Sequence, residues 1–182
     1  MIASINMTFD GFCDHTAAIA NAELHDFYTD MLRNAGIILS GRTTYKLMED
    51  FWPTVVKKPT GDKHLNDFAK AIDNVQKVLF SNTIKSVTWN NTRLATKSLK
   101  DEVTELKKQP GKDIFIGSPS LIAQLTRLNL VDVWQICVHP VIAGHGLPLF
   151  KGITDRIILK LLKTQTFKTS DHIVFFYAPG KE

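Results

Sequence analysis

With 182 residues, the chain is long enough for one well-buried core and short for two, which predicts a single domain over residues 1–182. Hydrophobic residues make up 44% of the chain and charged residues 22%, a composition that excludes a disordered or fibrous protein. The net charge of +4 comes from scattered basic residues. It suits an anionic ligand but falls short of a nucleic-acid-binding stripe, so we expect no nucleic-acid partner.

The cysteines, the first residues and the histidines give no indication of disulfides, of a membrane or of a metal site. Cys13 and Cys137 are far apart and form no Cys-x-x-Cys pair, as in reduced intracellular proteins. The first residues do not read as a signal peptide, and no stretch approaches the roughly 18 apolar residues of a membrane span. The six histidines show no close metal-binding spacing. We expect a cytoplasmic protein without a membrane partner or a metal.

The first elements are predicted by apolar periodicity and turn residues. Residues 2–12 indicate a short strand that turns at Asp10-Gly11. Apolar residues at helical spacing then indicate a helix over residues 24–32, with a C-cap signal at residues 34–36. The run at residues 36–40 indicates a buried strand. A second helix is expected after it, and Pro53 either ends this helix or lies just beyond its end.

The remaining chain continues this alternation and then ends in strands. Residues 57–70 are polar and predict a loop with a short helix. Two further helices are expected, over residues 98–109 and 118–130, the second with Leu121, Leu125 and Leu128 on one stripe. The remaining strands are expected at residues 77–83, 86–90, 113–117, 131–142, 158–167 and 172–178. The predicted fold class is therefore α/β, with a mostly parallel sheet, flanking helices and an antiparallel C-terminal edge.

Three of the predicted strands end in turns of similar composition. The turns are Gly41-Arg42-Thr43-Thr44, Ser81-Asn82-Thr83 and Gly117-Ser118-Pro119-Ser120. If the strands are parallel, these turns lie along the carboxyl edge of the sheet, where open α/β folds bind ligands.

The turn at Gly117 has the chemistry of an anion site. Glycine lets a ligand approach the backbone, Ser118 can cap the following helix, and Pro119 suits its first position. The hydroxyls of Ser118 and Ser120 could add hydrogen bonds, and the helix N-terminus favours negative charge. An ordinary helix start without a ligand is the alternative.

The turn at Gly41 repeats this design with a guanidinium. Arg42 suits a phosphate through its planar fork, and Thr43 or Thr44 could cap the helix. The alternative is a surface arginine beside a capped helix. Neither turn is GxGxxG, but two separated anion sites suit a dinucleotide with its extended phosphates.

Four carboxylates are candidates for proton transfer. Asp10 lies at the first turn, and Glu23, Asp26 and Asp30 lie on the first helix. Partial burial in a cleft would raise the pKa of such a group towards a useful range. A solvated helix face is the alternative for the helix carboxylates, and Asp10 could simply shape the turn.

The order of these motifs resembles a known family. The chain shows Asp10-Gly11, Gly41-Arg42-x-Thr44, Ser81, Gly117-Ser118, Leu130-Val131-Asp132, His139-Pro140-Val141-Ile142-x-Gly144-x-Gly146 and Leu149-Phe150. This series resembles the dihydrofolate-reductase-like family that contains the reductase domain of the bifunctional riboflavin-biosynthesis deaminase-reductase. The resemblance covers nearly the whole chain.

The resemblance implies a central sheet of about eight strands, NADPH as hydride donor and often a homodimer. It places the cofactor phosphates at the Gly41–Thr44 and Gly117-Ser118 turns and the adenosine side near Ser81. A pteridine or ribosylaminopyrimidine substrate would lie near the first-strand turn and the first helix. The cofactor-binding residues expected from the turns and the family together are Gly41, Arg42, Thr43, Thr44, Ser81, Asn82, Gly117, Ser118, Pro119 and Ser120.

The implied activity is hydride transfer to a C=N or C=O carbon, of the dihydrofolate reductase or 5-amino-6-(5-phosphoribosylamino)uracil reductase type. Asp26, Asp10 or a water that they orient would deliver the proton. The family usually has Gly-Gly and Asp-Glu where this chain has Gly117-Ser118 and Asp132-Val133. These departures motivate the alternative of a nucleotide-binding protein of the same fold without turnover.

Overall fold

The computed structural model describes residues 1–180, which form two compact units. Unit 1 combines Met1–Ile19 with Ile116–Glu182, of which residues 181 and 182 lie outside the described part, and unit 2 is Ala20–Phe115. The eight strands found in residues 1–180 belong to one sheet, mostly parallel with antiparallel strands at the C-terminal edge, and five α-helices flank it. This confirms the predicted fold class. That the chain forms a single domain stays a prediction.

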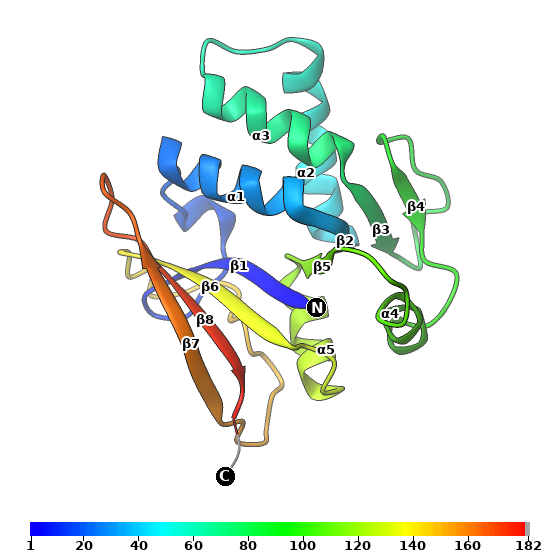
Figure 1. Cartoon of the computed structure of the whole chain (residues 1–182), viewed down its shortest axis with the longest axis vertical. Coiled ribbons are helices and arrows are strands. Elements are labelled where there is room, and N and C mark those ends of the chain that lie inside the picture. Colours follow the sequence, from blue (N-terminus) through cyan, green and yellow to red (C-terminus); the bar gives the residue numbers. More distant parts are fainter. Residues whose placement is uncertain (181–182) are drawn as a thin grey trace. The chain divides into compact units, whose positions relative to one another are not determined.

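Unit 2 is built of parallel strands and four helices, and Figure 1 shows α1 and α3 side by side within it. Its strand order is β4-β3-β2-β5. The strands are β2 (Ala35–Gly41), β3 (Gln76–Phe80), β4 (Thr92–Leu94) and β5 (Asp113–Ile116), and the helices are α1 (Ala22–Asn34), α2 (Arg42–Lys57), α3 (Lys63–Asn74) and α4 (Leu99–Leu106). In the parallel register, Leu39 lies opposite Val78 and Gly41 opposite Phe80. The ends of β2 and β3 therefore lie at the same edge.

Unit 1 has a parallel pair followed by an antiparallel ribbon, seen in Figure 1 as β8 beside β7. Its strand order is β1-β6-β8-β7, with β1 (Ile2–Thr8), β6 (Val133–His139), β7 (Leu159–Thr166) and β8 (Ile173–Pro179). Its helices are the short 3₁₀ helix η1 (His15–Ala17) and α5 (Pro119–Arg127). The apolar runs at residues 158–167 and 172–178 thus form the predicted antiparallel pair.

Helix α2 does not end at Pro53, contrary to the prediction. It runs through the proline to Lys57. A proline inside a helix lacks the N–H that would bond the carbonyl four residues earlier. Residues after it keep helical bonds, since Lys58 N–H donates to the Thr54 carbonyl at 2.9 Å, and Val55 is buried. Packing of this last turn outweighs the lost hydrogen bond.

The segment predicted as a loop with a short helix, residues 57–70, contains the first half of the twelve-residue helix α3. Its start is capped by Asp62, whose carboxylate accepts from the N–H groups of His64 and Leu65. The helix is amphipathic, with Ala69 and Ile72 buried. Charged residues on its outer face made the apolar pattern hard to recognise in the sequence, because a helix needs only one apolar stripe to pack.

The strand predicted at residues 86–90 is absent from the described structure, and the short strand lies later, at β4. Trp89 is instead a buried residue of the core. Its Nε1 donates to the Asp73 carboxylate at 2.8 Å, and the Lys77 ammonium lies 4.7 Å from its ring centroid. Aromatic residues favour β-strands, but the Trp89 side chain here packs into the core from a turn.

Helix boundaries also differ from the predicted caps. Helix α1 ends at Asn34 and β2 starts at once, with Ala35 extended, so no left-handed glycine cap forms. Gly36 is needed for space instead, because a Cβ there would lie 3.1 Å from the Lys112 carbonyl oxygen. At the next helix, Gly41 rather than Thr43 or Thr44 is the N-cap. Leu128 at the end of α5 is 39% exposed and leaves the stripe that Leu121 and Leu125 form.

Candidate functional site

The turns that follow β2 and β3 lie together at one edge of unit 2. Helix α2 begins at Arg42, directly after Gly41, and the side chains of Arg42 and Thr43 are exposed. The Ser81 hydroxyl accepts from the N–H groups of Thr83 and Ile84 and so shapes its own turn. Next to it, Asn82 is exposed and its carbonyl accepts from the Lys85 ammonium. The parallel register therefore brings together the predicted residues of these two turns.

The five α-helices of the described chain begin in two different ways. Three have a side-chain cap: Asn21 accepts from Leu24 in α1, Asp62 caps α3, and Ser98 accepts from Asp101 in α4. Helices α2 and α5 have no side-chain capping hydrogen bond and no acidic residue in the first turn. They are the two helices that follow the predicted phosphate turns. The partial positive charge at the N-termini of α2 and α5 is therefore not balanced by an acidic side chain from the first turn.

The Gly117 turn in unit 1 admits Ser118 without strain. Ser118 is the N-cap of α5 with an ordinary extended backbone (φ −98°, ψ 117°), and its side chain is 1% exposed. Pro119 occupies the first helical position, as predicted from the sequence, while Gly117 and Ser120 face solvent. The serine that replaces a second family glycine therefore turns into the protein.

Gly117 itself is not demanded by the surrounding protein. A Cβ at this position would meet only the Ser4 carbonyl oxygen, at an ordinary 3.4 Å, and the backbone φ is not in the left-handed region. The exposed backbone of Gly117 is therefore open to approach from outside at the start of α5.

Asp10 joins two loops of unit 1. Its carboxylate accepts from the Thr8 hydroxyl at 2.6 Å and from the N–H groups of Ala143 (3.1 Å) and Gly144 (2.7 Å). The Thr8 hydrogen bond, supported by the two backbone N–H groups, lowers the pKa of Asp10 to about 2. The group is thus ionised at neutral pH, where it can orient a water or a loop but cannot donate a proton.

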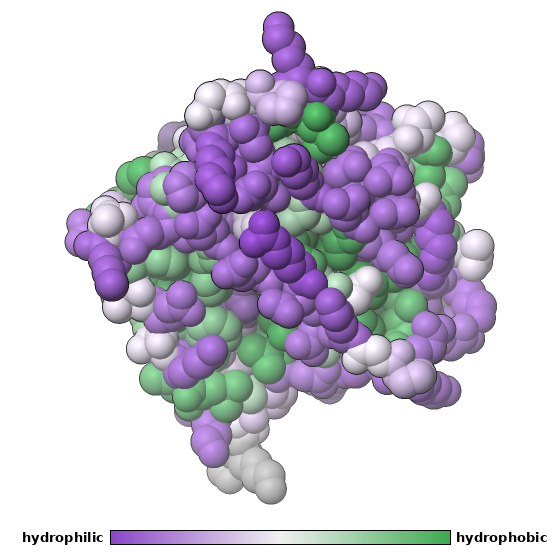
Figure 2. All heavy atoms as spheres, turned by 45° about the horizontal axis from the view of Figure 1, so that its top comes forward, coloured by the Kyte–Doolittle hydropathy of each residue, from purple (hydrophilic) through white to green (hydrophobic). Residues whose placement is uncertain are grey.

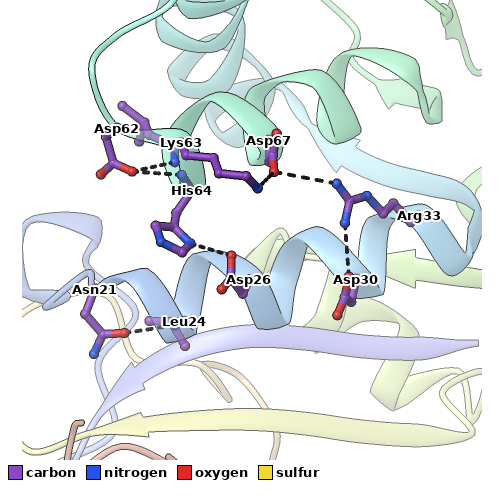
Figure 3. A network of polar contacts seen from close by, with 10 residues as sticks. Asn21, Leu24, Asp26, Asp30, Arg33, Asp62, Lys63, His64 and Asp67 are labelled. Carbon is purple, nitrogen blue, oxygen red and sulfur yellow. Dashed lines mark hydrogen bonds and ion pairs between the residues drawn. The ribbon is translucent and has the colours of Figure 1, made fainter.

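Asp26 lies in a network between α1 and α3, drawn in Figure 3. Its carboxylate, 56% exposed, contacts Nδ1 of His64 at 2.7 Å. One turn further along α1, Asp30 pairs with Arg33 at 3.3 Å, and the Arg33 guanidinium lies 3.9 Å from Asp67. The side of the molecule drawn in Figure 2 carries mainly hydrophilic side chains, with smaller apolar areas between them. Asp26 is a solvated carboxylate with an imidazole partner.

The sequence reasoning missed a buried histidine pair in unit 1. Nε2 of His172 lies 3.0 Å from Nδ1 of His139, and the two rings meet edge to face with centroids 4.3 Å apart. The signal was present in β1 and β6, where polar residues occupy alternate positions: Ser4, Asn6 and Thr8 in β1, with Gln135 opposite Ser4 and His139 opposite Thr8. Such alternation predicts one polar sheet face.

Two other classes of site are not found in the part of the chain that the structure describes. No three His, Cys, Asp or Glu side chains among residues 1–180 come together as metal ligands. None of the helices there combines the length and the apolar character that crossing a membrane requires.

Comparisons with known proteins agree on family and fold. The family model of the RibD C-terminal domain matches residues 1–174. The uncharacterised protein YyaP of Bacillus subtilis is 32% identical over 173 residues, which cover 93% of this chain and 89% of YyaP.

Two solved structures show the same fold at low identity. A protein provisionally assigned to riboflavin biosynthesis from Shewanella sp. PV-4 superposes with a TM-score of 0.74 at 17% identity, over 99% of this chain and 98% of that one. Dihydrofolate reductase from Enterococcus faecalis, solved with NADP(H), gives a TM-score of 0.66 at 13% identity, over 100% and 97% of the two chains. The fold is therefore dihydrofolate-reductase-like.

Proposed function

Because the chain belongs to the RibD C-terminal domain family, we propose that it is an NADPH-dependent reductase of a small heterocycle of the pteridine or ribosylaminopyrimidine type. The names of two structural neighbours, a riboflavin biosynthesis protein and a dihydrofolate reductase bound to NADP(H), support this class of chemistry. The reaction is hydride transfer to a C=N or C=O carbon.

The observation that carries the proposal is the pair of helix starts without side-chain caps. In α1, α3 and α4 a side chain accepts from the first turn, whereas α2 and α5 lack such a cap and follow Gly41 and Gly117. A helix N-terminus of this kind binds anions through its backbone N–H groups and its dipole. We assign cofactor phosphates to Gly41–Thr44 and Gly117–Ser120, with Arg42 as a charged donor, and the adenosine side to Ser81 and Asn82.

The protein's part in the reaction is to bind, orient and supply a proton. When bound, NADPH supplies the hydride. We propose that a water oriented by Asp26, whose exposed carboxylate contacts His64, delivers the proton. Asp10 stays ionised and is proposed to orient a water. A fixed geometry between donor and acceptor lowers the entropic part of the barrier.

A thermal-shift titration tests the proposal. NADPH, NADH and flavin are added separately to the purified protein, and the melting temperature is recorded. A ligand that binds only the folded state stabilises it by about 2.7 kcal/mol at one hundred times its dissociation constant. We expect the largest rise with NADPH, and the absence of any rise at millimolar NADPH would refute the proposal.

A binding protein of the same fold without turnover is a second candidate. The contacts of Asp10 favour it, because this carboxylate serves as a loop anchor and is ionised at neutral pH. NADPH binding without oxidation, across pterin and pyrimidine substrates, would select this candidate over the reductase.

Assembly and compartment are also proposals. We propose a cytoplasmic homodimer, in line with the resemblance to the reductase family. Light scattering on a size-exclusion column, with 20.5 kDa for one chain, distinguishes a dimer from a monomer.

A further inference from the structure

One face of the β1–β6 pair is polar although it is buried. The register places Ser4 opposite Gln135, and the Gln135 amide donates to the Ser4 hydroxyl at 2.8 Å. Thr8 lies opposite His139 on the same face, since side chains alternate along a strand. Burying polar groups is unfavourable unless they are hydrogen-bonded, so a polar sheet face calls for a use.

The end of this face is formed by His139 and His172, which are 1% and 2% exposed. Nδ1 of His139 accepts from the Ile19 N–H at 3.0 Å and faces Nε2 of His172 at 3.0 Å. An atom that accepts a hydrogen bond carries no proton, so the proton of neutral His139 resides on Nε2. The two contacts on Nδ1 thereby determine the tautomer.

His139 is neutral at physiological pH. Burial, with a smaller contribution from the neighbouring His172, lowers the pKa of His139 to about 4. A neutral imidazole of this tautomer has one N–H donor to offer, on Nε2.

That donor has no hydrogen-bond partner among the described residues, although the atom is buried. His139 also lines a small pocket together with Asn6, Met7, Thr8, Phe12, Asp14 and Ala18. The pocket volume of about 10 Å³ is close to that of a single water-sized probe. The space therefore has room for one small atom, and an acceptor oxygen there would complement an imidazole N–H.

We propose that His139 is a substrate-binding residue whose Nε2–H donates a hydrogen bond to a ring carbonyl oxygen of the heterocyclic substrate at the carboxyl end of β1 and β6. His172 is a positioning residue that acts through His139 by holding its tautomer. The inference rests on the proposed function for the identity of the substrate, since pteridines and ribosylaminopyrimidines both carry a ring carbonyl.

The experiment is NMR of protein labelled with ¹⁵N-histidine, which reports the tautomer and the hydrogen bonding of each imidazole. Spectra are recorded at neutral pH for the free protein and with saturating NADPH. They are then recorded with pterin or 5,6-diaminouracil added to the NADPH complex. We expect His139 to carry its proton on Nε2 and this signal to shift with at least one heterocycle. His145, an exposed histidine of the same unit, serves as the reference and stays unchanged.

Two variants separate donation from packing. His139→Phe removes the donor and should weaken heterocycle binding at least tenfold while the thermal shift with NADPH persists. His139→Gln keeps an N–H donor and should recover part of the affinity. His172→Phe leaves the Ile19 N–H as the remaining donor to Nδ1 and should raise the population of the other His139 tautomer, whereas His172→Gln, which keeps a second donor for Nδ1, should not.

The outcomes for the two proposals are distinguishable. A proton on Nδ1 of His139 overturns the inference without any ligand. So does an Nε2 signal that neither heterocycle moves in a protein that NADPH stabilises. A signal that moves with a heterocycle in a protein that NADPH does not stabilise supports the role of His139 and counts against the proposed cofactor.

Discussion

The parallel pairs β2–β3 and β1–β6 have similar geometry but different interiors. In β2–β3 the buried positions are mostly apolar, as with Leu39, Val78 and Leu79, and the candidate ligand residues come only after the strands end. In β1–β6 the strands themselves bury polar side chains, among them Thr8 and His139. The first pair holds its turns in place by packing, whereas the second encloses polar side chains beside a small pocket.

The largest expected effect is on the apolar pair. Leu39→Ala should lower the free energy of unfolding by about 2–5 kcal/mol, because it removes a side chain that is 1% exposed and leaves a cavity. Urea unfolding measures the change. Leu161→Ala, at a leucine that is 49% exposed, is the matched control and should cost far less. Equal losses at both positions would contradict a packing role for β2–β3.

The β1–β6 pair should make the free energy of unfolding depend on pH in the acidic range. In the unfolded chain His139 takes up a proton near its ordinary pKa of 6.5, but in the folded protein only near pH 4. Between these values the unfolded state binds more protons, so stability is complete above pH 6.5 and falls as the pH decreases to about 4. The loss from His139 should be about 3 kcal/mol.

Denaturant unfolding at a series of pH values measures this loss. Other titratable groups lie near His139 and titrate in the same experiment. Asp14 lines the same pocket, and burial also lowers the pKa of His172, which is next to Asp171 in the sequence. His139→Gln should flatten the profile over this window, while His64→Gln, at a half-exposed histidine of unit 2, should leave it steep. An unaltered slope in His139→Gln would show that other groups cause the acid sensitivity.

The turns that follow the apolar pair should respond in binding rather than in stability. Arg42→Ala should weaken NADPH binding at least tenfold, about 1.4 kcal/mol, through loss of a charged hydrogen bond to phosphate. The free energy of unfolding should hardly change, because Arg42 is exposed. Arg33→Ala removes the same charge at the end of α1 and should leave affinity intact. Calorimetry gives both affinities, and equal values for Arg42→Ala and wild type would exclude Arg42 from the site.

The smallest effects should come from the capped helices. Asn21→Ala and Asp62→Ala each remove a side-chain cap and should cost about 1 kcal/mol of stability. Neither change should alter NADPH affinity, since these N-termini are already satisfied by protein. A tenfold loss of affinity in either variant would end the distinction between capped and uncapped helix starts.

Much of the fold was predictable, because local patterns of apolar residues report which face an element buries. The strand at residues 113–117 and the helix start at Pro119 came from such patterns. Patterns failed where packing overrode a local preference. Pro53 lies inside a helix, α3 has a strongly charged outer face, and Trp89 packs into the core from a turn. In each case, burial of a few apolar atoms outweighs the intrinsic tendency of the residue.

The candidate site was predictable only in its turns. The turns proposed to bind phosphate are contiguous in sequence, so Gly41-Arg42 and Gly117-Ser118 could be selected as candidates from composition and order. Asp10 was recognised as a turn residue, but its partners Ala143 and Gly144 lie more than 130 positions away. The pKa of that carboxyl depends on those partners, and no local pattern could supply its direction.

By itself, the amino-acid sequence determined most of the elements, their α/β order and the two glycine turns that begin α2 and α5, because these depend on interactions within a few residues. Only the tertiary structure decided which helix starts lack a side-chain cap, that Ser118 turns inward, and that His139 meets His172. These features depend on strand register and on contacts between distant segments. A shift of one residue in the β1–β6 register would place the polar side chains on the opposite face.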